Sequence, residues 1–332
     1  MKVLVIGSHG FIGSRLVSNL IEKGHEVFGI DNLEIYSTKH IDFYFKNLDL
    51  RKKFFLKKLQ YFEKFDCKNY IFLEKIVGTF KPDVVINLGG NSVADKCKEN
   101  TYDSVMSIYN VNANILEVLK NIKNIKYIFI SSSMVYGNFE NSEVEEESNK
   151  NPIEPYGSLK LGAEYLVKSF SYQFGLSYLI VRPSAVYGPT DANMRVSGIF
   201  LYNSFLEKTL EVKNINEKLD FTYVQDLVDG LTLAIENKDV INETFNMTYG
   251  KSRTIKDFAE TLKNINPKIN ILLNSNNDQL MPGLKRPVRG TLDISKAKKM
   301  LGYDPQYPLE RGIREYYDFF RINLKNYFDD KS

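Results

Sequence analysis

The segment VLVIGSHGFIGSRL, residues 3–16, places three glycines between an apolar run and a helix-like run. Residues 3–6 are apolar and branched, which is typical of a buried strand, and residues 11–24 carry apolar side chains at helical spacing. Because Gly7, Gly10 and Gly13 have no side chains, the backbone N–H groups of the turn can approach a phosphate at the positive helix end. The segment predicts a strand, a tight turn and a helix that bind a dinucleotide.

The alternation of strand-like and helix-like runs continues to residue 182. Five short β-branched runs, at residues 2–7, 25–31, 81–88, 125–131 and 176–182, are separated by segments with helical spacing such as 109–122. Parallel strands joined by helices form a doubly wound sheet, which binds ligands at the carboxyl ends of its strands. We therefore expect an α/β fold with a Rossmann-type parallel sheet and assign residues 1–182 to the dinucleotide-binding domain.

Two regions depart from this rhythm. After residue 182 the connections lengthen and contain Asn and Pro, so we expect residues 183–332 to form mainly a smaller α/β substrate-binding lobe, with 220–248 returning to the first domain. Residues 33–58 form a long, aromatic and lysine-rich connection, interpreted as an accessory helical insertion before a strand at 59–66. Its RKKFFLKK stretch, 51–58, could bind nucleic acid, but it is more typical of a solvated helix face with a buried aromatic stripe.

Composition limits the partners. The chain has 332 residues, 43% of them hydrophobic, and a net charge of +3 from 44 basic and 41 acidic side chains. This balance argues against nucleic acid or a membrane as the main partner. No apolar run approaches the ~18 residues of a membrane span, and we expect a cytoplasmic protein. Cys67, Cys97 and three histidines confined to the first 40 residues predict neither a disulfide framework nor a metal site.

Asp31 indicates which dinucleotide is bound. It ends the second strand run, roughly 20 residues after the glycines, where an acidic side chain accepts hydrogen bonds from the adenosine ribose hydroxyls. The same carboxylate would repel a 2′-phosphate, so the sequence favours NAD over NADP. The alternative is a glycine-rich turn that binds no ligand.

The segment NPIEPYGSLKLGAEYLVKSF, 151–170, contains a candidate catalytic pair. Pro155 suits a helix start, and Tyr156 and Lys160 lie four residues apart on one helix face. A neighbouring ammonium and a positive nicotinamide ring both favour the phenolate form, so we expect Tyr156 to act as a base near neutral pH. The alternative is a buried tyrosine beside a surface lysine.

The ordered motifs together resemble a known family. They are GSHGFIG, DNL, DVVINLGGNSV, NVNANILEVL, SSSMVYG, YGSLK, RPSAVYGP, LDFTYVQDLVDG and LDISKAKKMLGYDP, and they run from Met1 to about Pro308. The chain resembles an extended short-chain dehydrogenase/reductase of the NAD-dependent epimerase/dehydratase family, which includes nucleotide-sugar 4-epimerases.

The resemblance implies a set of site residues. Ser132, Tyr156 and Lys160 would be catalytic. The residues that it implies for NAD binding, beside Tyr156 and Lys160, are Gly7, His9, Gly10, Phe11, Ile12, Gly13, Asp31, Asn32, Asp66, Cys67, Leu88, Gly89, Gly90, Asn110 and Pro183. Those expected to contact a nucleotide-diphosphate sugar are Ser92, Ser132, Ser133, Ser184, Arg195, Arg286 and Arg289.

Departures from the family pattern bear on the reaction. Relatives that eliminate water across C5 and C6 carry an Asp-Glu pair after the catalytic Ser or Thr, whereas this chain has Ser133 and Met134. Neither side chain exchanges a proton near neutral pH. Leu219 and Ala185 replace an arginine and an asparagine of many relatives, so we expect Arg195 and Arg289, then Arg286, to meet the phosphate charge. Each arginine could instead form a surface ion pair.

Four functions compete at this level. The leading prediction is a C4-epimerase with retained NAD, followed by a 4-dehydrogenase that releases its 4-keto sugar or epimerises beside it. A 4,6-dehydratase is disfavoured by Met134, and a non-catalytic nucleotide-sugar sensor is disfavoured by the intact catalytic set. The sequence does not rank the sugar or the base. The helical segments 109–122 and 156–175 carry apolar residues beyond those that cover one sheet, so we expect at least a homodimer.

Overall fold

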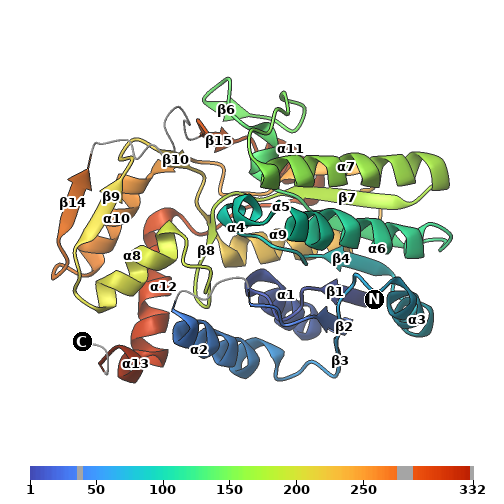
Figure 1. Ribbon diagram of the computed structural model, residues 1–332, viewed down its shortest axis with the longest axis horizontal. Coiled ribbons are helices and arrows are strands. Elements are labelled where there is room, and N and C mark those ends of the chain that lie inside the picture. The colour runs from blue at the N-terminus through green and yellow to red at the C-terminus, as the bar shows by residue number, and fades with distance from the viewer. Residues whose placement is uncertain (36–39, 275–286, 330–332) are drawn as a thin grey trace.

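The computed structural model describes residues 1–35, 40–274 and 287–329. A seven-stranded parallel sheet runs through it in the order β12-β7-β5-β4-β1-β2-β3 (Figure 1). In chain order the strands are β1 (Lys2–Ile6), β2 (Glu26–Asp31), β3 (Tyr61–Lys64), β4 (Val84–Asn87), β5 (Lys126–Ile130), β7 (Ser177–Arg182) and β12 (Glu243–Asn246). The predicted α/β fold with a doubly wound parallel sheet is confirmed.

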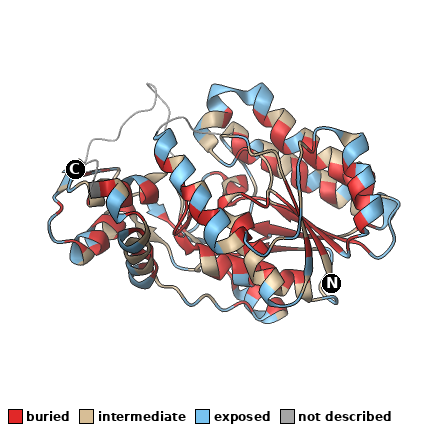
Figure 2. Ribbon diagram, turned by 90° about the horizontal axis from the view of Figure 1, so that it is seen from below, coloured by how far each residue is buried: buried red, intermediate tan, exposed pale blue. Residues whose placement is uncertain are grey.

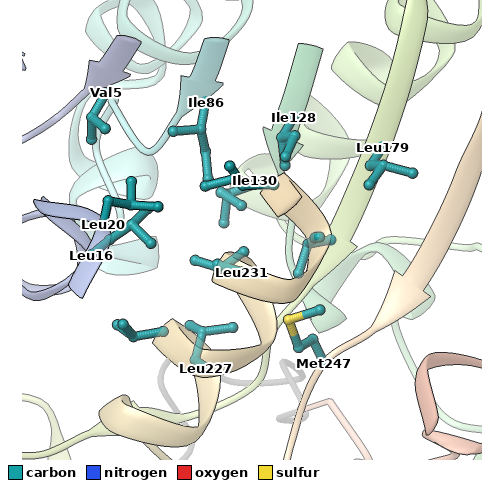
Figure 3. Close-up of a cluster of buried hydrophobic side chains, with 14 of the residues drawn as sticks. Val5, Leu16, Leu20, Ile86, Ile128, Ile130, Leu179, Leu227, Leu231 and Met247 are labelled. Carbon is teal, nitrogen blue, oxygen red and sulfur yellow. The ribbon is translucent and has the colours of Figure 1, made fainter. Parts of the chain in front are cut away.

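Alternate residues of the central strands β1, β4, β5 and β7 enter two separate cores, as the period of two requires. Val3 and Val5 of β1 pack with α1 (Phe11–Glu22), α9 (Val224–Glu236) and α11 (Ser295–Leu301). In Figure 3, Val5, Ile86 and Ile128 point from their strands toward Leu16 and Leu20 of α1 and Leu227 and Leu231 of α9. Leu4 and Ile6 face α3 (Tyr70–Phe80), α6 (Val111–Leu119) and α7 (Pro155–Phe174) on the other side. Figure 2 shows the sheet buried between helices whose outer faces are exposed.

The parallel register brings the strand ends to one edge. Val3 pairs with Val27 and with Val84, and the register continues across β4, β5, β7 and β12. The carboxyl ends of β1, β2, β4, β5 and β7 therefore meet at the same edge of the sheet, where ligands bind in open α/β folds. The connections that follow them include α4 (Ala94–Glu99), α5 (Thr101–Ser104), the π-helix η2 (Val105–Asn110) and the 3-10 helix η3 (Ser133–Tyr136).

A second lobe follows β7 and has an aromatic core. Its short strand pairs are β8 (Val186–Tyr187) with β11 (Thr222–Tyr223), β9 (Leu210–Lys213) with β14 (Ile271–Asn274), and β10 (Lys218–Leu219) with β13 (Arg253–Thr254). Its helices are α8 (Val196–Phe205), α10 (Ile255–Ile265), α12 (Leu309–Asn323) and α13 (Lys325–Asp329). The pair β6 (Glu143–Val144) and β15 (Thr291–Leu292) joins the two halves of the chain. Among the described helices, none is both long and apolar enough to cross a bilayer.

The accessory insertion forms α2 (Ile41–Arg51) and the π-helix η1 (Lys52–Leu56). The predicted solvated basic face with a buried aromatic stripe was wrong at two positions: Arg51 is 4% exposed, whereas Phe54 is 42% exposed. The reason is that α2 packs into the second lobe, where Phe43 joins the aromatic core, and Arg51 faces backbone carbonyls. In Figure 1, α2 lies beside α12 and α13.

A buried ion pair joins the end of strand β7 to helix α7. Arg182 and Glu164 form a bidentate contact, with Nε to Oε1 at 2.9 Å and Nη2 to Oε2 at 2.6 Å. Arg182 also donates to the Tyr136 hydroxyl and the Glu146 carbonyl, and Ser131 donates to Glu164. Burial alone would lower the pKa of Arg182, but the Glu164 contacts raise it above its ordinary value. The two charges are thus compensated inside the fold.

We predict that Glu164→Gln lowers the free energy of unfolding by about 3–5 kcal/mol, because it leaves the Arg182 charge buried and unpaired. Urea unfolding measures the effect. The control is Glu260→Gln, which breaks the exposed 3.6 Å ion pair with Lys256 and should change the stability by less than about 0.5 kcal/mol. Equal effects of the two substitutions would contradict this role of the buried pair.

Candidate active site

A cavity of about 370 Å³ opens at the carboxyl edge of the sheet and lies between the two lobes. The first lobe contributes the glycine turn and the segments that follow β2, β3, β4 and β5. The second lobe contributes residues 183–186, Asn193, residues 195–197, Leu219, Phe221 and Arg289. The site therefore brings together segments from the first and last thirds of the chain.

The glycine turn approaches α1 too closely for side chains. A Cβ on Gly13 would lie 2.0 Å from the Gly7 carbonyl oxygen, and Gly7 itself has a φ of +82°. Gly10, the N-cap of α1, provides no side-chain cap. The first N–H groups of a helix have no intrahelical acceptor, so this turn can donate them to an anion in the cavity. His9, Phe11 and Ile12 line the cavity with the three glycines.

Asp31 organises the next part of the cavity. Its Oδ2 accepts a hydrogen bond from the His9 N–H at 2.9 Å, and its Oδ1 accepts one from the Leu33 N–H at 2.8 Å. Each carboxylate oxygen has further acceptor capacity for a ribose hydroxyl. Asn32, Asp66 and Cys67 line the same end of the cavity. Burial raises the pKa of Cys67 to about 12, which keeps its thiol neutral.

The structure brings together the predicted catalytic residues. Ser132 follows β5, Tyr156 lies in the first turn of α7, and Lys160 is one turn further; all three are buried and line the cavity. The Lys160 Nζ lies 5.8 Å from the centre of the Tyr156 ring and donates a hydrogen bond to the Ile130 carbonyl at 2.8 Å. This carbonyl ends β5, so the sheet itself holds the lysine.

The protein groups around Tyr156 act on its pKa in opposite directions. Burial raises the pKa of Tyr156 to about 12, although the charge of Arg195 and a hydrogen bond from Ser132 act to lower it. Burial also lowers the pKa of Lys160 to about 8. The desolvation of the phenolate therefore outweighs its neighbours. A positively charged ligand ring beside Tyr156 would act in the direction that favours proton loss.

The remaining predicted residues fall into three groups. Leu88, Gly89, Gly90, Ser92, Ser133, Pro183, Ser184, Arg195 and Arg289 line the cavity. Arg286 lies outside the described residues. Asn110 ends the π-helix η2 and is not among the described residues that line the cavity, whereas Ser107 and Val111 are, so its contact with the cofactor stays a prediction.

Sequence reasoning missed several lining residues. Tyr44, Leu48 and Arg51 of α2 face the cavity, and their spacing of four and three residues is the signal that could have identified one helix face. Asn193 and Phe221 also line it. They lie in irregular segments, where no periodic pattern marks a side chain.

Acidic and apolar groups occupy different parts of the cavity. The carboxylates among its described lining residues are Asp31, Glu34 and Asp66, which follow β2 and β3. Around Ser132 and Tyr156 the lining consists of hydroxyls, Met134 and cationic side chains, with Ala185, Leu219 and Phe221 on the second lobe. Among the described lining residues, Tyr156 thus offers proton transfer through its phenol, and the carboxylates belong to the segments at the ends of β2 and β3.

The comparisons with known proteins agree with this geometry. The family model described as "GDP-mannose 4,6 dehydratase" matches residues 4–316. The crystal structure of the UDP-glucose 4-epimerase of Thermotoga maritima with UDP-glucose is 26% identical, covers 98% of this chain and 100% of that chain, and has a TM-score of 0.85. The UDP-glucuronic acid 4-epimerase of Bacillus cereus, in complex with UDP-glucuronic acid and NAD, is 28% identical at 97% and 99% coverage, with a TM-score of 0.85.

A curated relative carries a different activity in its name. The dTDP-glucose 4,6-dehydratase of Haemophilus influenzae is 26% identical over 97% of this chain and 98% of its own. Epimerases and dehydratases are thus both similar to the chain over nearly its full length, and the resemblance inferred from the motifs is confirmed. The chain belongs to the GDP-mannose 4,6-dehydratase family, within the NAD-dependent epimerases and dehydratases of the extended short-chain dehydrogenase/reductases.

Proposed function

We propose that this protein is an NAD-dependent nucleotide-sugar epimerase that reversibly oxidises its substrate at sugar C4. The observation that carries the proposal is the cavity at the edge of the sheet, where Ser132, Tyr156 and Lys160 lie together and residues 133–134 supply no acid-base pair. NAD supplies the hydride acceptor when it is bound.

The first lobe binds and orients the cofactor in this proposal. The N–H groups at the start of α1 would bind the pyrophosphate, and Asp31 would accept the hydroxyls of the adenosine ribose. A 2′-phosphate would place a second negative charge beside Asp31, so the protein should select NAD over NADP. Asp66 and Cys67, which line the cavity, would flank the adenine, whereas Leu88–Gly90 and Pro183 would border the nicotinamide half.

The chemistry is a proton transfer at the sugar C4 hydroxyl. Tyr156, as phenolate, takes this proton while the hydride leaves C4, and Ser132 donates a hydrogen bond to the reacting oxygen. Lys160 has donors beyond the one that it gives to the Ile130 carbonyl, and these would hold the nicotinamide ribose. When the 4-keto sugar is reduced on its other face, Tyr156 would return the proton to the C4 oxygen, so that C4 is inverted without net oxidation.

The choice among reaction types rests on Met134. Elimination of water from C5 and C6 needs an acid and a base beside the reacting carbons, and the lining around Tyr156 lacks a carboxylate among the described residues. The dehydratases among the relatives make a 4,6-dehydratase the second candidate. A 4-dehydrogenase that releases the 4-keto sugar would share the first step, the oxidation at C4. A non-catalytic sensor would not need Ser132, Tyr156 and Lys160 together.

The direct experiment is to incubate the purified protein with UDP-glucose, UDP-glucuronic acid, dTDP-glucose and GDP-mannose, each with NAD. NMR identifies the products, and absorbance at the NADH band reports cofactor turnover. A C4-inverted sugar without net NADH supports the epimerase, and stoichiometric NADH supports the dehydrogenase. Binding of a nucleotide sugar without any conversion would contradict an enzymatic function.

We predict that Tyr156→Phe lowers the rate of C4 oxidation at least ~100-fold, the low end for loss of a general base. Tyr61→Phe is the control, because Tyr61 is 46% exposed on β3 and does not line the cavity. We also expect no 6-deoxy-4-keto product from any of the four sugars. NMR detection of such a product would show that a residue other than Met134 supplies the protons of elimination.

We predict that Arg195→Gln moves the pH–rate profile to higher pH. The phenolate is the active base, so the rate rises as Tyr156 loses its proton, and Arg195 is the main charge that lowers the pKa of Tyr156. Removing that charge raises this pKa and shifts the rise of the rate upward. Initial rates over a pH series test the shift. Arg289→Gln is the comparison, and an equal displacement in both variants would contradict a specific effect of Arg195.

We further propose that the protein assembles as at least a homodimer through α6 and α7. These helices cover the sheet with one face, while Tyr165 and Tyr172 on α7 are 59% and 93% exposed. Exposed aromatic side chains on a helical surface are typical of a subunit interface. Light scattering at micromolar concentration should give a mass of twice 38.3 kDa or more; a monomer mass would reject the interface.

A further inference from the structure

Arg51 of the insertion is buried between the cofactor turn and a loop of the second lobe. Its Nη1 donates to the His9 carbonyl at 3.2 Å, and its Nε and Nη2 donate to the Thr190 carbonyl at 3.2 and 2.6 Å. His9 lies in the glycine turn, and Thr190 lies in the segment between β8 and α8. One side chain therefore bridges the two halves of the cavity.

This bridge is formed by a charged side chain, although an apolar side chain would cost less free energy to bury. Arg51 is 4% exposed, and its hydrogen-bond acceptors in the structure are neutral carbonyls rather than carboxylates. Burial lowers its pKa, and Tyr44, Asp191 and Asp31 counteract this only through their charge. Burying an ion without a contacting counter-ion costs free energy. A buried charge of this kind is retained more readily if the fixed position of the guanidinium contributes to function.

The insertion holds Arg51 firmly relative to the second lobe. Phe43, about two turns earlier on α2, packs edge-to-face against Tyr202 at 5.1 Å and Phe320 at 5.5 Å between ring centres. Tyr327 of α13 donates a hydrogen bond to Asp42 at 2.9 Å. A shift of the guanidinium would therefore require α2 to leave the aromatic core.

The loop that Arg51 holds is strained and carries substrate-facing residues. Thr190 has a φ of +71°, a conformation that a β-branched residue adopts only when its surroundings impose it. Arg15 of α1 donates to the neighbouring Pro189 carbonyl at 3.2 Å and stacks on Phe55 of the insertion at 4.4 Å. A few residues later, Asn193 and Arg195 reach the cavity.

We propose that Arg51 is a positioning residue that couples cofactor binding to the sugar-binding loop, residues 188–195. This proposal rests on the proposed function, because NAD and the nucleotide sugar are the two ligands whose binding Arg51 would couple. When the glycine turn is ordered by the NAD pyrophosphate, the His9 carbonyl fixes Arg51, and Arg51 fixes the Thr190 carbonyl. Asn193 and Arg195 are then held in place for the sugar. Coupling between two ligands is reciprocal, so each ligand should tighten the binding of the other.

The test is hydrogen exchange of the whole chain with NAD alone as the probe. In the wild type, NAD should slow exchange of the amides in residues 188–197 about tenfold, which corresponds to ~1.4 kcal/mol of protection. In Arg51→Gln this NAD-dependent change should disappear, while the amides of the glycine turn still gain protection. A purely structural role would accelerate exchange with and without NAD alike.

Two further variants make the test specific. Arg51→Lys keeps the charge but cannot meet both carbonyls with a planar fork, so NAD should still protect the glycine turn but should protect residues 188–197 less than in the wild type. Lys46→Gln removes an exposed charge from the same helix and should behave as the wild type. If Arg51→Gln fails to fold, the comparison of Arg51→Lys with the wild type still tests whether Arg51 couples NAD binding to the protection of residues 188–197.

The contrary outcomes are distinct. Loop protection by NAD that persists in both Arg51 variants overturns the coupling, as does a wild type whose loop does not respond to NAD. A wild type that binds NAD but converts no nucleotide sugar contradicts the proposed function, and the exchange measurement then decides the role of Arg51 by itself. A wild type that binds no NAD overturns both.

Discussion

The bidentate contact between Glu164 and Arg182 determines how the parts of the active site meet. Arg182 is the last residue of β7 and directly precedes Pro183 and Ser184, and Glu164 lies one turn beyond Lys160 on α7. Ser131, which donates to the same carboxylate, is followed by Ser132. A single buried pair thus sets the relative position of β5, β7 and α7. Because both ions are desolvated, the geometry that satisfies them is narrow.

Much of the site could be predicted from the sequence because its main motifs are local. The glycine turn and the Tyr156–Lys160 pair are local patterns, since their spacing alone places them on a turn and on one helix face. A family motif gives a residue but not its rotation about a π-helix, so the contact of Asn110 with the cofactor stays a prediction. The pKa of Tyr156 depends on how much water the folded chain excludes, which no short motif contains.

Arg51 illustrates the other limit of sequence reasoning. A basic stretch next to exposed lysines is normally solvated, and its neighbours Lys52 and Lys53 are exposed. Only the packing of α2 against a lobe formed much later in the chain turns Arg51 inward, toward two carbonyls. Such a position is a property of tertiary structure. The same is true of the apolar wall formed by Leu219 and Phe221 opposite the catalytic strand end.

The union of α2 with the C-terminal helices also has a consequence for synthesis on the ribosome. Phe43 is translated well before its aromatic partners Phe320 and Phe328, which lie more than 270 residues further along the chain. Until they appear, Phe43 has only part of its aromatic core, including Tyr202, although the strands of the seven-stranded sheet are already complete. Contacts of such sequence separation form slowly and expose intermediates to aggregation. The insertion that follows β2 of the N-terminal sheet therefore completes its packing only after α12 and α13 have been made.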